Sequence, residues 1–386
     1  MIGERSRLRN TLAEVEVPAK ASFYCLIGKK VGLDVHTFFH MGFIDASGEA
    51  VPLLEVGKVG DLGLRFQDKA FGILCNALFS KTGALIRNEQ HLLRKRCHSD
   101  LSFDITYSAY QVTRRQYLYF LGLLKDINRQ QLDFFESEMD KLIEKEGGLG
   151  IYESHEYRAK FYNLFFPYGQ LNAFQPIKDS QRFQCKEIAL WDTGPSFDQG
   201  IINSQSLRAS EQAQSLSYSN TCRHTGVDFL MAVLGGNHSL YPPAVSTNFI
   251  NQLPCFTSMK DGRYTNNLYL LPLPPSAYGL ENEQHKILST VYLRMETMLL
   301  KNSLHANTQP KFKVLQTMYE QLLDKREAKV NFLDVIAKHA QQEKNQQIIG
   351  QHRGWHWPFF HSTRTNDMFE LFNNERKTQY NLIPTL

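Results

Sequence analysis

The stretch Ser219-Asn220-Thr221-Cys222-Arg223-His224-Thr225-Gly226-Val227-Asp228-Phe229-Leu230-Met231 decides how the rest of the chain is interpreted. Apolar residues in and after it recur at the i, i+3, i+4 and i+7 spacing of an amphipathic helix: Val227, Leu230, Met231 and Leu234. The polar residues just before Cys222 are suitable N-caps, and Gly235-Gly236 is typical of a helix end. The sequence therefore predicts a helix over 221–234 with Cys222 in its first turn.

The position of Cys222 favours a reactive thiol. Backbone N–H groups in the first turn of a helix have no partner within the helix, and the helix dipole is positive there. Both effects favour the thiolate, and they can lower the ordinary thiol pKa of about 8.5 by one or more units. The neighbouring Arg223 adds positive charge. A cysteine nucleophile is usually placed in this way. The alternative is that Cys222 packs as a small apolar side chain.

The composition is that of a soluble globular protein with room for two or three domains. Of the 386 residues, 42% are hydrophobic and 21% are charged. The formal net charge of +4 is small and no long basic run occurs, so nucleic-acid binding is not expected. The first twenty residues lack the apolar core of a signal peptide, and no stretch approaches the roughly 18 apolar residues that a membrane span needs.

The cysteines are scattered without a Cys-x-x-Cys pair, at Cys25, Cys75, Cys97, Cys185, Cys222 and Cys255. This spacing argues against a zinc site and against a disulfide scaffold, and it is typical of a reducing compartment. We therefore expect no metal and no cofactor.

A β-hairpin is predicted near the start of the chain. Aromatic and β-branched residues favour strands over 23–28 and 35–45, and Asp45-Ala46-Ser47-Gly48 favours a turn before a return strand over 51–57. Alternation places His36, Phe38 and His40 on one face, and Thr37, Phe39, Met41 and Phe43 on the other. With a four-residue turn Asp45 opposes Ala50, so that His40 faces Glu55 and His36 lies near Val59. The two histidines could form a metal pair, but no third ligand is evident nearby.

The remaining chain divides into segments that differ in their predicted secondary structure. A strand is predicted over 101–110, followed by a helix that Thr113 caps and that continues to about residue 145. Residues 150–218 are rich in Gly, Pro, Asn, Gln and Ser and are interpreted as a loop-rich insertion. We expect one domain over 20–240, an extended, Pro-rich linker over 241–282 and a mostly α-helical domain over 283–386.

The order of the candidate residues is the reverse of that in ordinary papain-like proteases, because the histidine strand precedes the cysteine helix. The segment from His36 to Gly42 resembles the sheet histidine motif of circularly permuted papain-like proteins of the NlpC/P60 type, and Asn220-Thr221-Cys222-Arg223 resembles their cysteine motif. The resemblance implies an α+β fold, a permuted papain-like domain in which an antiparallel sheet packs on the Cys-bearing helix. It also implies that Cys222 is the nucleophile and His36 the base, with His40 as the alternative base.

The sequence does not decide which residue orients the catalytic histidine or which groups form the oxyanion hole. Glu55 could orient His40 directly, or His36 only diagonally, and a register slip by one residue would move Glu55 to the other face. The N–H of Cys222 together with the Asn220 side chain could form an oxyanion hole. Otherwise His36 is a hydrogen-bonded sheet histidine and Asn220 a simple N-cap.

A second, more diffuse resemblance covers nearly the whole chain. Several segments resemble effectors of the Legionella type, which a type IV secretion system delivers: the run from Phe23 through the histidine strand, Tyr107-Ser108-Ala109-Tyr110, the start of the Cys222 helix, 269–275 and Gln351-His352-Arg353. The resemblance implies a protein made in a bacterium that works in the cytoplasm of a host cell. One departure is the segment 373–377, which is not acidic as such secretion tails often are.

These observations lead to one expected function and one alternative. We expect a cysteine-dependent hydrolase or transferase that acts on an amide, ester or peptide bond of a host protein or of a small substrate. The alternative is a non-catalytic effector that binds a host protein and uses the papain-like core as a scaffold. Permuted papain folds include peptidases, amidases, deamidases and acyltransferases, and no residue chooses among these reactions or fixes the oligomeric state.

Overall fold

The computed structural model of the chain describes residues 14–31, 36–60, 81–82, 84–88, 103–145, 171–177, 180–188, 215–216, 220–234, 253–260, 263–326, 330–351 and 362–381. The described residues form an antiparallel half-barrel sheet and a mostly helical C-terminal region, so the fold is mixed α+β. Contacts divide the chain into two compact units. The first comprises 1–236, 246–251 and 257–268, and the second comprises 237–245, 252–256 and 269–386.

The half-barrel of the first unit has the strand order β12-β11-β7-β2-β3-β4-β6. Its strands are β2 (Ser22–Lys30), β3 (Thr37–Ile44), β4 (Ala50–Gly60), β6 (Ala84–Asn88), β7 (Phe103–Val112), β11 (Cys255–Lys260) and β12 (Arg263–Tyr264). Neighbours from β7 through β6 pair antiparallel. The strands predicted over 23–28 and 51–57 are thereby confirmed. Those predicted over 35–45 and 101–110 correspond to β3 and β7, and their residues 35, 101 and 102 lie outside the described residues. Residues 255–260 and 263–264, which the sequence places within a linker, instead form β11 and β12.

Two smaller sheets involve the segment that was predicted to be a loop-rich insertion. A three-stranded sheet has the order β1-β9-β8, formed by β1 (Glu14–Glu16), β8 (Asn172–Pro176) and β9 (Arg182–Glu187). A second, two-stranded sheet joins β5 (Lys81–Thr82) to β10 (Ser215–Leu216). Short strands of this kind are difficult to recognise in sequence because their pairing partners are far away along the chain.

The β3–β4 hairpin has the predicted pairing of His40 with Glu55, but a different turn. Ile44, not Asp45, lies opposite Ala50, and the register shifts between Met41 and Gly42. A bulge inserts one extra residue into a strand and moves the pairing by one position. The turn over residues 45–49 is one residue longer than predicted, and the register shift compensates for the extra residue. The pairing beyond the shift is therefore the one that the four-residue turn predicted.

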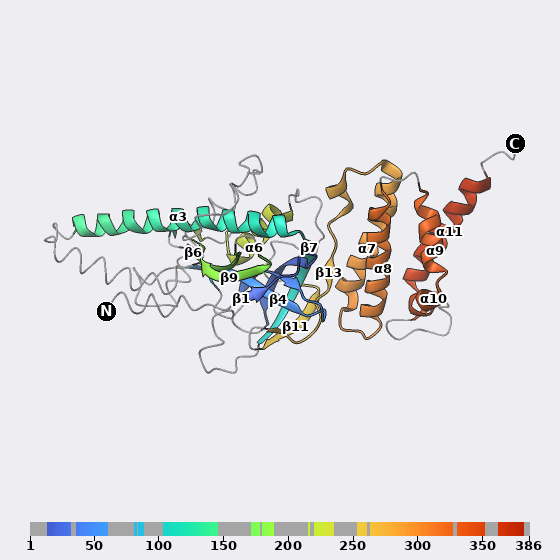
Figure 1. Cartoon of the computed structure of the whole chain (residues 1–386), viewed down its shortest axis with the longest axis horizontal. Coiled ribbons are helices and arrows are strands. Elements are labelled where there is room, and N and C mark those ends of the chain that lie inside the picture. Colours follow the sequence, from blue (N-terminus) through green and yellow to red (C-terminus); the bar gives the residue numbers. More distant parts are fainter. Residues whose placement is uncertain are drawn as a thin grey trace. The chain divides into compact units, whose positions relative to one another are not determined.

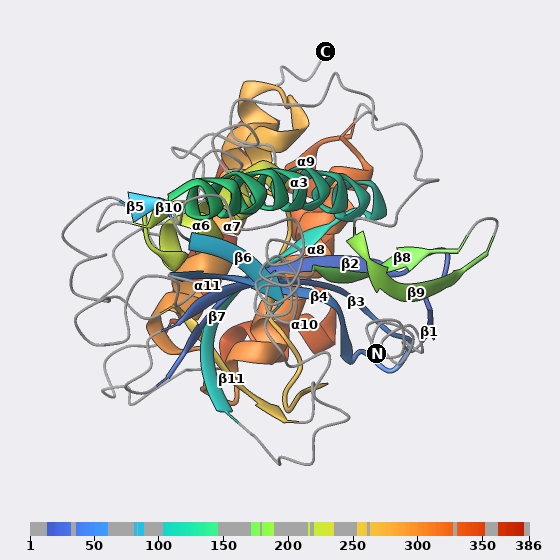
Figure 2. The ribbon, with the colours of Figure 1, turned by 90° about the vertical axis from the view of Figure 1, so that its left-hand side faces the viewer.

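Two helices cover one face of the half-barrel, α3 (Arg114–Lys145) and α6 (Cys222–Leu234). Figures 1 and 2 both show them on the same side of the sheet. The Phe39 ring of β3 packs against Phe120 of α3 and Phe229 of α6, with centroids 4.9 and 5.9 Å away. Buried aromatic rings contribute strongly to such a core because each removes a large apolar area from water. The odd-numbered face of β3 is therefore the helix-covered face.

The start of α3 is fixed by a capping box, as the sequence predicted. Thr113 Oγ1 accepts a hydrogen bond from the Gln116 N–H at 3.2 Å, and Gln116 Oε1 accepts one from the Thr113 N–H at 2.8 Å. Such reciprocal bonds satisfy two backbone donors that the helix itself leaves without partners.

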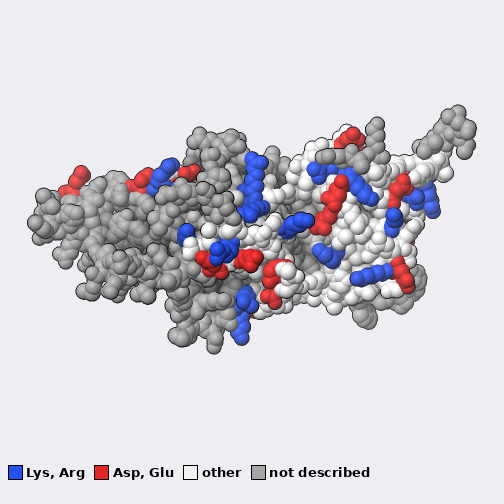
Figure 3. All heavy atoms as spheres, viewed as in Figure 1, with Lys and Arg blue, Asp and Glu red and all other residues white. Residues whose placement is uncertain are grey.

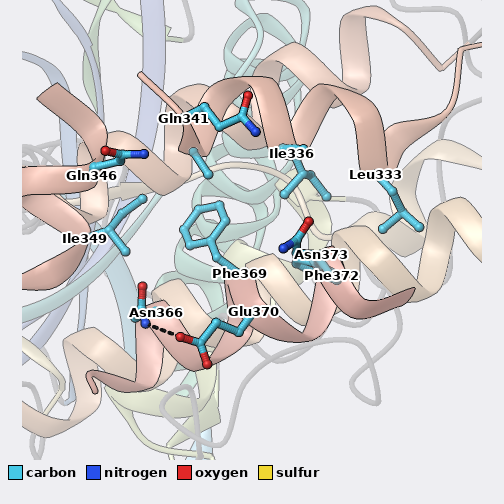
Figure 4. A pocket seen from close by; sticks show the side chains of 12 residues that line it. Leu333, Ile336, Gln341, Gln346, Ile349, Asn366, Phe369, Glu370, Phe372 and Asn373 are labelled. Atoms are coloured by element: carbon cyan, nitrogen blue, oxygen red, sulfur yellow. Dashed lines mark hydrogen bonds between the residues drawn. The ribbon is translucent and has the colours of Figure 1, made fainter. Parts of the chain in front are cut away.

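The C-terminal region consists of β13 (Leu270–Leu271), the 3-10 helix η5 (Pro275–Tyr278) and the helices α7 (Asn282–Asn302), α8 (Thr308–Asp324), α9 (Phe332–Ala340), α10 (Glu343–Gly350) and α11 (Arg364–Asn381). A hollow of about 350 Å³ opens among α9, α10 and α11 (Figure 4), lined by apolar and amide side chains such as Leu333, Phe369 and Gln346. Among the helices that the structure describes, none combines the length and the apolar character needed to cross a bilayer.

Candidate functional site

Cys222 is the first residue of α6, as the sequence predicted. Thr221 is the N-cap, because its C=O accepts the Thr225 N–H at 3.2 Å, and its own N–H donates to Nδ1 of His224 at 3.2 Å. His224 thus occupies the position that Glu or Gln takes in a capping box. The predicted stop at Gly235-Gly236 lies outside the described residues, but α6 ends just before it, at Leu234.

The structure brings Cys222 and His36 together. The thiol forms a side-chain hydrogen bond with His36, and it is also hydrogen-bonded by the backbone and the side chain of Thr37. Burial alone would raise the pKa of the Cys222 thiol, but the hydrogen bond and the charge of His36, helped by Thr37, outweigh it and leave the pKa below its ordinary value. An imidazole next to a thiol at a helix start favours the thiolate–imidazolium pair.

The position of His36 differs from the one that alternation predicted. Since β3 begins at Thr37, His36 precedes the strand and does not follow its alternation. The side chain of Thr37 lies against Gly226 of α6, which shows that the sheet faces the helix start at this point. His36 therefore reaches the helix-covered face, whereas Phe38 and His40 lie on the other face of β3.

His40 and Glu55 form a separate polar cluster on that other face. Nε2 of His40 lies 2.7 Å from Oε2 of Glu55, and both side chains are fully buried. The other ring nitrogen of His40 contacts the hydroxyl of Tyr264 on β12, and that hydroxyl is hydrogen-bonded to Tyr24. Neither the alternative base His40 nor the candidate orienting residue Glu55 is therefore positioned to act on Cys222.

Asn220 lies beside the cysteine, but its side-chain oxygen is engaged by a lysine. Nζ of Lys58 donates to Oδ1 of Asn220 at 2.8 Å, to the Asn220 carbonyl at 3.3 Å and to Oγ1 of Thr225 at 3.1 Å. These three bonds use the full donor capacity of an ammonium group. Lys58 thus fastens the start of α6 to β4, and the Asn220 oxygen has a structural role.

Two further cations surround the thiol. Burial and, after it, the charge of Arg223 lower the pKa of Lys29 on β2, while the Cys222 thiolate opposes this shift. Burial also lowers the pKa of Arg223, and the thiolate again opposes the shift. The side chains of Lys29, Lys58 and Arg223 are buried, with 7%, 3% and 1% of their surface exposed. Burial lowers the pKa of Lys58 to about 7, against the opposing fields of Cys222 and Asp228.

The other described cysteines are in a different environment. Cys25 and Cys185 are buried, and burial raises the pKa of both thiols, to about 12 in Cys185. Cys255 is also buried, whereas Cys222 is partly exposed. Among the described cysteines, Cys222 is thus distinguished by its access to solvent, and its thiol pKa is shifted in the direction opposite to those of Cys25 and Cys185.

Sequence reasoning identified Cys222 and His36 but overlooked Lys29 and Lys58. A signal was present: each is a lysine inside an otherwise apolar strand, in Phe23-Tyr24-Cys25-Leu26-Ile27-Gly28-Lys29 and in Leu53-Leu54-Glu55-Val56-Gly57-Lys58. A charged residue at a buried strand position needs a partner, and such positions often belong to a site.

The arrangement has what nucleophilic catalysis requires, a thiol whose pKa is lowered and an imidazole that exchanges a proton with it. Among the described residues, no group of three His, Cys, Asp or Glu side chains is arranged to hold a metal ion. No protein-family model, curated protein or solved structure was found to match the chain.

Proposed function

We propose that the protein is a cysteine-dependent hydrolase or transferase in which Cys222 is the nucleophile and His36 the general acid and base. The observation that carries the proposal is the hydrogen-bonded Cys222–His36 pair at the start of α6, in surroundings that lower the thiol pKa. Buried structural cysteines such as Cys25 have the opposite shift.

The pair accounts for an acyl transfer in two steps. The Cys222 thiolate attacks the carbonyl carbon of an amide or ester, and the His36 imidazolium gives its proton to the leaving amine or alcohol. Water or an acceptor amine then attacks the thioester, His36 takes its proton, and the thiolate is restored. The N–H groups of the first turn of α6 supply donors for the oxyanion.

The fold that we propose for this unit is a circularly permuted papain-like one. Three features support it: the histidine segment precedes the cysteine helix in sequence, the sheet is an antiparallel half-barrel, and α6 packs on that sheet. On the same resemblance we propose that the enzyme is a bacterial effector delivered to host cytoplasm, where a translocation reporter fused to the chain should become active.

Selective alkylation tests the catalytic proposal. Iodoacetamide at neutral pH should label Cys222 in the folded protein at least about tenfold faster than in denatured protein, because only the thiolate reacts. Cys222→Ala should abolish this labelling, and Cys25→Ala, the matched control, should leave it unchanged. His36→Ala should slow it by about tenfold or more.

The thermal midpoint of each variant must be measured in parallel. Labelling of Cys222 that is no faster than in denatured protein, in a well-folded sample, would leave only the alternative of a non-catalytic binding protein.

A further inference from the structure

Thr37, the first residue of β3, presents two hydrogen-bond donors to Cys222. Its hydroxyl and its backbone N–H are both hydrogen-bonded to the thiol. Thr37 is buried, with 2% of its surface exposed, whereas Cys222 is partly exposed. A thiolate has no proton to give, so both bonds then run from Thr37 to the sulfur.

The backbone of β3 explains why the Thr37 N–H is available to the sulfur. On the β2 side, the ladder bond next to it runs from the Lys30 N–H to the His36 carbonyl, at 3.0 Å. Successive residues of a strand direct their backbone groups to opposite neighbours, so the Thr37 N–H points away from β2. Among the described residues, the pairing of β3 with β4 ends at Phe38 and Gly57. The Thr37 N–H therefore lies beyond that ladder and donates to the sulfur instead.

The side chain of Thr37 is held in place by α6. Its methyl carbon Cγ2 lies 3.4 Å from the position that a Cβ atom on Gly226 would take, so the methyl group packs against the helix. A β-branched side chain has few allowed χ1 values. Holding the methyl group against the helix therefore also fixes the direction of the hydroxyl, which is the one that reaches the sulfur.

We propose that Thr37 is a further catalytic residue, whose hydroxyl and backbone N–H hold the Cys222 sulfur as a thiolate before the substrate arrives. The proposal rests on the proposed function, since it adds a group that acts on the same nucleophile. His36 takes up the thiol proton and Thr37 stabilises the anion that remains. Hydrogen bonds to an ionised group are about twice as strong as neutral ones. On the face that Figure 3 shows, basic and acidic side chains of the described residues are interspersed, so their long-range fields oppose one another and short-range donors matter more.

The same bonds weaken during the attack on a substrate. The sulfur loses its negative charge as it bonds to the substrate carbon, so donors that stabilise the thiolate stabilise the transition state less. Among thiols, nucleophilicity falls as the pKa falls, with a Brønsted coefficient of about 0.4–0.5. Thr37 should therefore raise the fraction of thiolate near neutral pH and lower the rate at which each thiolate reacts.

Thr37→Val tests the proposal, because it keeps the branched shape and removes only the hydroxyl. Iodoacetamide forms a bond from Sγ of Cys222 to its methylene carbon and releases iodide. The pH profile of this reaction, followed by peptide mass spectrometry, gives the thiol pKa from its midpoint and the reactivity of the thiolate from its plateau. The midpoint should rise by about one pH unit or more, and the plateau rate should rise by about threefold. An unchanged midpoint in the folded variant would overturn the proposal.

Thr37→Ser and Thr106→Val are the matched controls. Serine restores the hydroxyl and should return the midpoint most of the way to that of the unchanged protein. Thr106 of β7 is also buried and lies opposite Lys29, as Thr37 does on β3, so valine there removes a hydroxyl from the same face two strands away. It should leave the profile unchanged. Equal shifts in Thr37→Val and Thr106→Val would show that the contact with the sulfur is not the cause.

The measurements separate this proposal from the catalytic one. A midpoint near the ordinary thiol value of about 8.5 in the unchanged protein overturns both proposals. A low midpoint that rises in His36→Ala but not in Thr37→Val overturns only the role of Thr37. Adding His36→Ala to Thr37→Val should raise the midpoint further; no further rise would show that valine displaces Cys222 and that Thr37 acts only through packing. Thermal midpoints are measured in parallel, and Thr37→Ala gives the same test if the valine variant does not fold.

Discussion

At the scale of single residues, Lys58 connects the chemistry of Cys222 with the stability of the fold. Its ordinary pKa of 10.5 falls to about 7 on burial. Between these values the unfolded chain binds a proton that the folded protein does not, so stability rises with pH across this window. Below pH 7 both states hold the proton, and the folded protein bears a cost on the order of 5 kcal/mol, at about 1.4 kcal/mol for each pKa unit. A residue kept at such a cost is a candidate for function.

Lys58→Gln should separate the charge of this residue from its hydrogen bonds. The amide retains donors for Asn220 and Thr225 but lacks the positive charge that favours the Cys222 thiolate. We expect the thiol pKa to rise, so that the pH profile of iodoacetamide alkylation moves to higher pH. The gain in stability between pH 7 and pH 10 should also disappear from urea unfolding curves.

Lys30→Gln is the control, because it removes the same charge from β2, which is separated from β4 by β3. An alkylation profile that stays in place in folded Lys58→Gln would show that Lys58 acts only as a structural fastener.

His40→Leu should destabilise the protein without changing the reactivity of Cys222. The substitution leaves Glu55 buried without its imidazole partner, and breaking a buried pair on one side costs about 3–5 kcal/mol. Urea unfolding measures this loss, while alkylation under native conditions should proceed at the rate of the unchanged protein. Slower alkylation in the folded variant would instead connect His40 with the site.

The site could be predicted from sequence only where local signals are strong. Cys222 follows from N-cap residues and an apolar stripe, and the structure places it at the first position of α6. Whether His36 or His40 contacts it depends on where β3 begins, and strand ends are set by pairing with distant residues rather than by local sequence. The inclusion of Lys29 and Lys58 depends on cross-strand register, which no local pattern contains.

At the scale of elements, the approach of α6 to the sheet depends on Gly226. A Cβ atom at this position would lie 3.1 Å from Cδ1 of Ile27 and 3.4 Å from Cγ2 of Thr37. The missing side chain therefore lets the first turns of α6 pack directly on β2 and β3. This close packing is what brings Cys222 to His36 and Thr37.

Gly226→Leu should move α6 away from the sheet. The larger side chain cannot be accommodated against Ile27 and Thr37, and overpacking of this kind costs about 1–3 kcal/mol. We expect alkylation of Cys222 to slow by about tenfold or more, while Cys25 stays protected within the sheet. Gly226→Ala is the graded control, because its single methyl group requires only a small shift of Ile27 and favours the helix. Rapid alkylation in folded Gly226→Leu would contradict this account.

The helices and strands show which sequence signals are sufficient to predict an element. The helix after Thr113 was predictable because capping residues and apolar spacing agree locally, whereas β11 and β12 are short and are stabilised by strands far away in sequence. The pairing of His40 with Glu55 was predicted from a turn that differs from the actual one, and the bulge at Met41 and Gly42 restored it. A correct pairing therefore did not require a correct turn.

At the scale of the whole molecule, the first compact unit is discontinuous in sequence. It continues past α6 to include residues 257–268, which carry most of β11 and all of β12. The hydroxyl of Tyr264 on β12 contacts His40 inside the half-barrel. A boundary near residue 240, as the change in composition after α6 predicts, would remove these strands from the sheet that they complete.

A fragment of residues 1–268 should therefore fold, whereas a fragment of residues 1–240 should not. The shorter fragment exposes the edge of β7 and leaves a buried nitrogen of His40 without its hydroxyl partner, which alone costs about 1–3 kcal/mol. The shorter fragment also loses the packing of the partly buried Tyr264 ring and the pairing of β11 with β7. These losses act against the roughly 5–15 kcal/mol that stabilise a typical domain. Circular dichroism melts should show a cooperative transition for 1–268 only.

Iodoacetamide should label Cys222 selectively in 1–268, but should label Cys25 as readily as Cys222 in 1–240, because an unfolded half-barrel no longer protects β2. Equal melting of the two fragments, with Cys25 protected in both, would show that β11 and β12 are dispensable for the half-barrel.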